Sequence, residues 1–266
     1  MAHPGDSHWF LVPRPAPAAA LRLFCIPYAG GGASMFQRWA ARLPAGVELC
    51  AVQLPGRETR LDEEPFDRFE PLLDALELAL LPYLDRRFAL FGHSMGAILA
   101  FELARALERR GAAPAHVIAS GRAAPQLADR RAPIHGLPPA QFLAEVSALG
   151  GTPPELLAHG EVRRALLPTL QADFAAIERW RYAARPPLTA PLTAVGGAAD
   201  PRIGRAELDA WRAQTTGEFA LQLFAGGHFF LRESEAELVA LLAARCSIAT
   251  SAATRPATRP PDPGVP

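Results

Sequence analysis

The stretch RFALFGHSMGAILAFELARALERRG (residues 87–111) decides the fold class of this chain. Its first residues are almost continuously apolar, which is typical of a strand buried on both faces of a sheet. Apolar residues from Ile98 onward recur at helical spacing, and Gly111 is suited to end that helix. A buried strand that turns directly into a helix is the unit from which parallel α/β sheets are built.

The same alternation of strand and helix extends in both directions along the chain. Buried strands are predicted at 21–27, 47–55, 87–92, 116–121, 191–197 and 219–227. Helical patterns lie at about 66–84, 95–111, 204–214 and 233–245. Apolar strands that alternate with helices predict an α/β fold, with a mostly parallel sheet and helices on both of its faces.

Three segments depart from this alternation. Residues 122–187 contain nine prolines and helix-like stretches near 139–149, 155–167 and 168–182, but no convincing strand. An insertion of this length is more often a cap or lid than an ordinary connection, and a small helical domain without a gating role is the alternative. Residues 1–20 are expected to wrap the surface, and residues 247–266 have the composition of a disordered tail. The α/β domain is therefore expected to span 21–246.

The composition excludes several functional classes. The chain has 266 residues, and its 27 basic and 27 acidic side chains cancel, so no strong positive field attracts nucleic acid or anionic lipid. Three cysteines without CxxC spacing (Cys25, Cys50 and Cys246) argue against a disulfide framework or a structural zinc site. Without a signal-peptide pattern or an apolar run of about 18 residues, we expect a cytoplasmic protein that does not span a membrane. The sequence has no metal-binding motif, so we expect no metal and no cofactor.

The G-x-S-x-G pattern at residues 92–96 makes Ser94 the candidate nucleophile. A serine on a tight turn between strand and helix is lifted above the edge of the sheet, and the glycines leave room for neighbouring chain. The amino end of the following helix adds partial positive charge where an oxyanion would form.

A serine nucleophile needs a base, and in this topology an acid and then a histidine follow later strands. Asp200 comes directly after the fifth predicted strand, and His228 comes directly after the sixth. Asp200 could instead be an ordinary turn aspartate, but Asp173 is a poorer candidate for the acid because it does not follow a strand end. His93 is expected to pack in the turn rather than act as the base.

The loop that follows the first predicted strand is the candidate second half of an oxyanion hole. Its small residues, in the segment YAGGG (28–32), let backbone N–H groups approach a substrate oxygen closely. The N–H groups of Ala29 and Met95 are the expected pair of donors. A phosphate-binding role is not favoured, because neither Gly-Lys-Ser/Thr nor G-x-G-x-x-G occurs.

Several longer stretches resemble the external, or type II, thioesterases of polyketide and nonribosomal peptide assembly lines. They are FCIPYAGGGAS (24–34), VQLPGRE (52–58), FGHSMGAILAFELAR (91–105), SGRAAP (120–125), IHGLPPAQFL (134–143), LPTLQADF (167–174), GGAAD (196–200) and GGHFFL (226–231). The PGRE and IHGLP segments are far more specific than G-x-S-x-G. The resemblance covers roughly residues 20–245, and one departure is Gln171, where the family often has arginine at a position that is not catalytic.

The resemblance implies an α/β-hydrolase fold in which the insertion at 122–187 is a helical lid over the acyl site. It implies a serine thioesterase, with Ser94, His228 and Asp200 as the triad, that cleaves acyl groups from the phosphopantetheine arms of acyl or peptidyl carrier protein domains. Such an enzyme would remove stalled or wrongly loaded groups from a polyketide synthase or nonribosomal peptide synthetase, without a cofactor of its own, and we expect a monomer. Two alternatives stay open, namely a general serine carboxylesterase or lipase and a non-catalytic binding protein on the same fold.

Apolar residues of the insertion are candidates to line an acyl chamber, although ordinary packing of the lid is as consistent with them. They are Phe142, Leu143, Leu149, Leu156, Leu170, Phe174 and Trp180. Four arginines of the insertion are candidates to receive an acidic carrier protein, and a solvated helix face is the alternative. They are Arg163, Arg164, Arg179 and Arg181.

Overall fold

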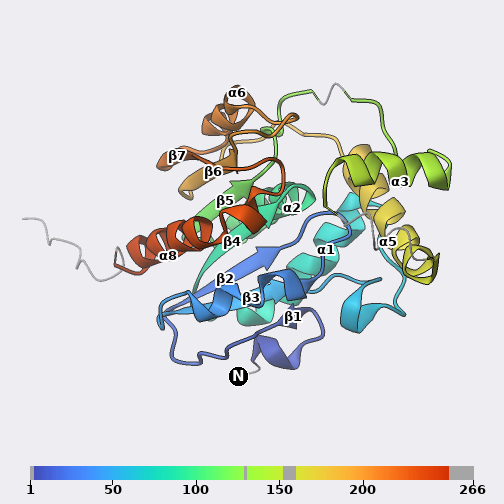
Figure 1. Cartoon of the computed structure of the whole chain (residues 1–266). Coiled ribbons are helices and arrows are strands. Elements are labelled where there is room, and N and C mark those ends of the chain that lie inside the picture. The colour runs from blue at the N-terminus through green and yellow to red at the C-terminus, as the bar shows by residue number, and fades with distance from the viewer. Residues whose placement is uncertain (1–2, 129–130, 152–159, 252–266) are drawn as a thin grey trace, which may run out of the picture.

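Seven strands form one sheet within the residues that the computed structural model describes, namely 3–128, 131–151 and 160–251. In their order across the sheet they are β1 (Phe10–Leu11), β3 (Val47–Val52), β2 (Leu21–Ile26), β4 (Arg87–His93), β5 (His116–Ser120), β6 (Leu192–Gly197) and β7 (Phe219–Phe224). All neighbouring strands pair in parallel except β1, which is antiparallel to β3 (Figure 1). The six predicted strands are confirmed, and the chain has a mostly parallel sheet.

Helices cover both faces of this sheet, as predicted. The α-helices outside the insertion are α1 (Phe69–Leu80), α2 (Met95–Arg109), α6 (Arg205–Asp209), α7 (Phe230–Glu233) and α8 (Glu235–Ser251). Short 3₁₀ helices are η1 (Pro4–Asp6), η2 (Ala33–Phe36), η3 (Trp39–Ala41), η4 (Glu58–Arg60), η5 (Leu81–Tyr83) and η6 (Ala210–Gln214). One apolar core contains buried side chains of α1, α2 and α6, and a second contains those of α7 and α8. Among the described helices, none combines the length and apolar character needed to cross a membrane.

The insertion at 122–187 is helical, and two of its helices are described. They are α3 (Pro139–Ala148) and α5 (Gly160–Arg179), which lie at one end of the sheet (Figure 1). The prediction of separate helices at 155–167 and 168–182 is wrong over the described part, because α5 continues through Pro168. A proline removes one hydrogen bond from a helix interior. Packing of the residues that follow it, including Leu170 and Ala176, keeps the helix in place.

Both termini of the domain contribute more structure than the composition indicates. Residues 1–20 were expected only to wrap the surface, but β1 extends the sheet, and Phe10 is buried with its ring 5.5 Å from those of Phe24 and Tyr83. A two-residue strand is too short to show periodicity, so the sequence could not reveal it. The predicted start of the tail at residue 247 is too early, because α8 continues to Ser251 and Ala249 is buried. The remainder, 252–266, lies outside the described residues.

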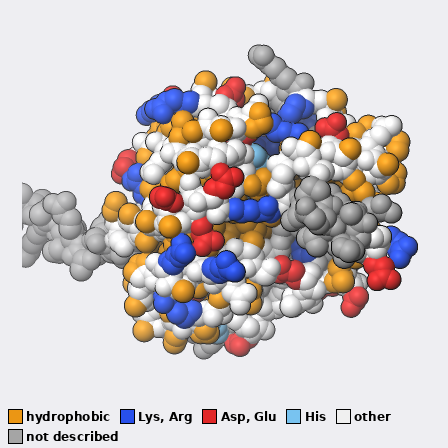
Figure 2. Space-filling view, in the orientation of Figure 1, with side chains coloured by type: hydrophobic (Ala, Val, Ile, Leu, Met, Phe, Trp, Pro, Cys, Tyr) orange, Lys and Arg blue, Asp and Glu red, His pale blue; other side chains and the backbone are white. Residues whose placement is uncertain are grey.

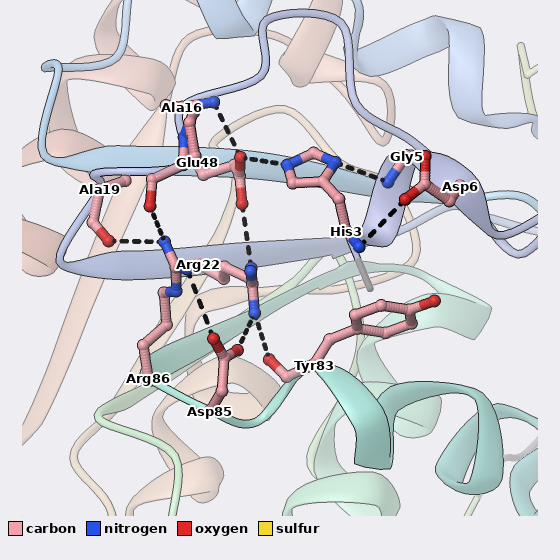
Figure 3. Close-up of polar contacts among 11 residues, drawn as sticks. His3, Gly5, Asp6, Ala16, Ala19, Arg22, Glu48, Tyr83, Asp85 and Arg86 are labelled. Carbon is pink, nitrogen blue, oxygen red and sulfur yellow. Dashed lines mark hydrogen bonds and ion pairs between the residues drawn. The ribbon is translucent and has the colours of Figure 1, made fainter. Parts of the chain in front are cut away.

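A buried ionic cluster ties the amino-terminal segment to the sheet (Figure 3). Arg22 of β2 and Glu48 of β3 lie opposite each other in register, and their side chains are 2% and 0% exposed. The Arg22 guanidinium donates to Glu48 (2.9 Å) and also pairs with Asp85. Glu48 accepts further hydrogen bonds from His3 Nε2 (2.8 Å) and from the Ala16 N–H (2.8 Å). Arg22 therefore pairs with two carboxylates at the amino ends of the strands, and Arg86 adds a second positive charge beside Asp85.

Replacing Arg22 by methionine is expected to lower the free energy of unfolding by about 3–5 kcal/mol, because the buried carboxylate of Glu48 would lose its arginine partner. Urea unfolding followed by circular dichroism measures the change. Arg212→Met is the matched control, since Arg212 pairs with Asp209 on the exposed surface. It should alter the free energy by less than about 1 kcal/mol. Equal effects of the two substitutions would contradict the assignment.

Candidate active site

The turn between β4 and α2 holds Ser94 in a strained backbone conformation. Its φ and ψ angles are 55° and −110°, which few residues other than glycine adopt. The flanking glycines are required by space, since a Cβ on Gly92 would lie 1.9 Å from the Gly96 carbonyl oxygen. A Cβ on Gly96 would lie 2.3 Å from the carbonyl oxygen of Ile26. The turn therefore presents the serine hydroxyl at the carboxyl end of β4, closely packed against the end of β2.

Asp200 and His228 meet at the same edge of the sheet, after β6 and β7. The His228 Nδ1 atom lies 2.7 Å from Asp200 Oδ2. The other carboxylate oxygen accepts hydrogen bonds from the N–H groups of Arg202 (2.8 Å) and Ile203 (3.3 Å). Because a carboxylate only accepts, Nδ1 carries a proton and Nε2 is left as the basic nitrogen.

The protonation state of Asp200 follows from these contacts. Burial raises the pKa of this carboxyl, but hydrogen bonds from His228 and from the backbone, together with the charge of His228, outweigh burial, so its pKa is lowered. The side chain is 0% exposed, against 12% for His228. Asp200 is therefore an ionised group that can orient the imidazole and stabilise its charged form.

His93 connects the imidazole of His228 to the nucleophile turn. Its ring centroid lies 5.2 Å from that of His228, and its Nδ1 lies 2.9 Å from the Ser120 hydroxyl. Burial, followed by the nearby charge of His228, lowers the pKa of His93 well below its ordinary value. Gly121 leaves room for this ring, since a Cβ there would lie 2.5 Å from it. His93 is thus a neutral packing residue beside Ser94, in keeping with its expected place in the turn.

The two expected oxyanion donors come from adjoining segments. Met95 is the first residue of α2, and Ala29 lies in the loop after β2. The loop turns back on itself through a hydrogen bond from the Gly31 N–H to the Tyr28 carbonyl (2.8 Å). Gly30 has a φ of 77°, a conformation that favours glycine. The glycine-rich segment therefore forms a tight loop next to the nucleophile turn.

The lid residues expected at the acyl site fall into two groups. Phe142 is fully buried, with its ring perpendicular to that of Phe174 at 5.5 Å, and partly buried Leu143 joins the same apolar cluster. Leu170 also belongs to this cluster and reaches the loop after β2, where it would touch a Cβ on Gly30.

Trp180 is not part of that cluster, and its place in an acyl chamber stays a prediction. It follows the last residue of α5, and its ring packs 5.6 Å from Phe69 of α1. Leu156 lies outside the described residues.

The described lid arginines make contacts of different kinds. Arg179 pairs with Asp67 at 3.3 Å, and Arg181 donates to backbone carbonyls of its own segment. Arg164 is exposed, and the side chain of Arg163 lies outside the description. On the face shown in Figure 2, positive and negative side chains are scattered among one another. A role in carrier docking stays a prediction.

Two charged residues for which the sequence predicts no role lie next to this site. Arg57 belongs to the PGRE segment, and Asp173 of α5 is by sequence only a poor candidate for the acid. They form a buried ion pair, with Arg57 Nη1 2.6 Å from Asp173 Oδ2. Their separation of 116 residues along the chain left no local pattern that could pair them.

Comparison with known proteins places the chain among thioesterases. The model of the family described as "Thioesterase domain" matches residues 21–246. The chain is 43% identical to the linear gramicidin dehydrogenase LgrE of Brevibacillus parabrevis, over 90% of this chain and 93% of the relative. It is 40% identical to the thioesterase PikA5 of Streptomyces venezuelae, over 86% of this chain and 82% of the relative. The structure of BorB, a type II thioesterase from the borrelidin biosynthetic cluster, superposes with a TM-score of 0.83 at 37% identity, covering 89% of this chain and 97% of BorB.

Proposed function

Because this chain belongs to the thioesterase family, we propose that it hydrolyses acyl thioesters carried on the phosphopantetheine arms of carrier protein domains. Its physiological role is to free assembly lines that make polyketides or nonribosomal peptides from stalled or wrongly loaded acyl groups. The observation that carries the proposal is the hydrogen bond between Asp200 and His228, beside a strained serine turn in a thioesterase fold.

In the first half of the reaction, the Ser94 oxygen attacks the thioester carbonyl while His228 Nε2 takes the hydroxyl proton. Asp200 holds the ring through Nδ1 and stabilises its positive charge. The N–H groups of Ala29 and Met95 bind the oxyanion of the tetrahedral intermediate, and one such donor is worth about 3–4 kcal/mol. The carbon–sulfur bond then breaks, and the phosphopantetheine sulfur leaves with the proton from His228.

The second half releases the acid. A water molecule gives a proton to His228 Nε2 and attacks the acyl-serine carbonyl, and the same donors bind the second oxyanion. The acyl–oxygen bond breaks as Ser94 regains its proton from His228. A thiol with a pKa near 8.5 is a better leaving group than an alcohol, so the first half demands little acid catalysis. The phosphopantetheine arm belongs to the substrate, and the mechanism uses no cofactor of the enzyme.

A comparison of substrates with the same acyl group tests the proposal. We expect kcat/KM for the carrier-bound thioester to exceed that for the corresponding alkyl oxygen ester by more than about tenfold, because binding of the carrier and its arm contributes to transition-state stabilisation. Chromatographic measurement of the released free acid gives both rates. Preference for the oxygen ester would instead indicate a general carboxylesterase. Failure to turn over either substrate, or to react with a fluorophosphonate, would indicate a non-catalytic binding protein.

A further inference from the structure

The loop that carries Ala29 is held by two buried charged residues from outside it. Asp173 Oδ2 accepts a hydrogen bond from the Gly30 N–H at 2.7 Å. Arg57 binds this carboxylate through both terminal nitrogens, at 2.6 and 2.8 Å, and also donates to the Gly31 carbonyl oxygen at 3.2 Å. The side chains are only 4% exposed for Arg57 and 2% for Asp173. The ion pair therefore binds the peptide group before Gly30 and the peptide group after Gly31.

The lid helix α5 supplies this carboxylate, and it packs on the α/β domain at the same place. The hydroxyl of Thr169, four residues before Asp173, donates to the Gly56 carbonyl oxygen beside Arg57. Leu170 covers Gly30 so closely that a Cβ there would lie 2.3 Å from its side chain. The middle of α5 is thus fastened to the PGRE segment and to the loop after β2.

We infer that Asp173 and Arg57 are positioning residues of the oxyanion hole, an inference that rests on the proposed thioesterase function. The Ala29 N–H belongs to the Tyr28–Ala29 peptide, whose carbonyl oxygen accepts a hydrogen bond from the Gly31 N–H at 2.8 Å. The hydrogen bond from Gly30 to Asp173 fixes the next peptide, so the two bonds together hold the Ala29 N–H in one direction. It also occupies the Gly30 N–H, so Gly30 is not itself an oxyanion donor.

The pair also has to be neutral. A carboxylate bound to the residue after Ala29 would repel the negative charge that develops on the substrate oxygen. The bidentate contact with Arg57 cancels that charge without giving up the hydrogen bond to Gly30. A buried ion pair often adds little net stability to a fold. The Arg57–Asp173 pair instead holds a catalytic loop in one geometry.

Arg57→Gln tests the inference, with Arg22→Gln as a matched control. Both remove an arginine from a buried ion pair, but Arg22 lies among the amino ends of the strands. Three quantities are measured for each variant, namely kcat and KM with an acyl-pantetheine thioester, the melting temperature, and inhibition by a trifluoromethyl ketone analogue. The analogue adds to Ser94 and forms an oxyanion, so its affinity reports on the hole rather than on substrate binding.

For Arg57→Gln we expect kcat to fall by about 10- to 100-fold, KM to change by less than about threefold, and analogue affinity to weaken in parallel with kcat/KM. The double variant Arg57→Gln/Asp173→Asn, which removes the uncompensated carboxylate, should regain part of that loss. Arg22→Gln should lower the melting temperature and leave kcat and analogue affinity unchanged.

Two outcomes would overturn the inference: normal kcat and analogue affinity in folded Arg57→Gln, or an equal loss of both in Arg22→Gln. If Arg57→Gln does not fold, Arg57→Lys replaces it, because lysine keeps the charge but loses the two-pronged contact. A smaller loss of the same kind is then expected, and no loss refutes the inference. Absence of thioester hydrolysis by the wild-type enzyme would instead refute the proposed function, so the two failures are distinguishable.

Discussion

Ser94→Ala is expected to reduce hydrolysis of an acyl-carrier thioester by roughly 10⁴- to 10⁶-fold. Alanine removes the side-chain hydroxyl from the strained turn between β4 and α2, so no acyl-enzyme can form there. Any remaining rate would come from the oxyanion donors and from direct attack by water. Labelling by a fluorophosphonate should be lost at the same time, because that reagent needs the same oxygen.

Single-turnover release of a radiolabelled acyl group from the carrier measures this loss over the required range. Ser7→Ala is the control, since it makes the same chemical change in the amino-terminal segment and should leave the rate unchanged. A Ser94→Ala protein that still released the acid within tenfold of the wild-type rate would remove Ser94 from the mechanism.

Asp200→Asn is expected to lower kcat by about 10³- to 10⁴-fold while leaving the fold intact. The amide keeps an oxygen to accept from the N–H groups of Arg202 and Ile203, so the turn after β6 is preserved. Its NH₂ group, however, faces the Nδ1 atom of His228 and forces the ring proton onto Nε2. That nitrogen can then no longer accept the proton of Ser94.

Steady-state kinetics with the carrier-bound substrate measures this effect, and circular dichroism verifies the fold. Asp209→Asn is the matched control, because Asp209 lies on the exposed surface of α6 and should give the wild-type rate. A loss of less than about tenfold in Asp200→Asn would show that another group orients His228.

Much of this arrangement could be predicted from local patterns. The strands are short apolar runs, and this sequence pattern is the same wherever a strand lies in the sheet. All six predicted strands occur in the structure. The G-x-S-x-G turn could be placed because its residues are contiguous. The meeting of Asp200 and His228 could be predicted because each follows a strand, and a parallel sheet brings the carboxyl ends of its strands to one edge.

Where local and tertiary effects compete, the local patterns failed. Pro168 indicates a helix end, but α5 continues past it because the helix packs on the α/β domain. Trp180 contacts Phe69 of α1 just after the end of α5, and no local pattern predicts that contact. The two-residue strand β1 exists only because β3 is beside it.

By itself, the sequence determined the α/β class, the order of the strands along the chain and the residue types at the carboxyl edge of the sheet, because neighbouring residues specify each of them. Only the tertiary structure decided that Asp173 on the lid helix would meet Arg57 and the Gly30 N–H. That contact joins segments more than 100 residues apart. It forms only when the inserted helix packs on the α/β domain. A carboxylate buried there needs both a cation and a hydrogen-bond donor as partners.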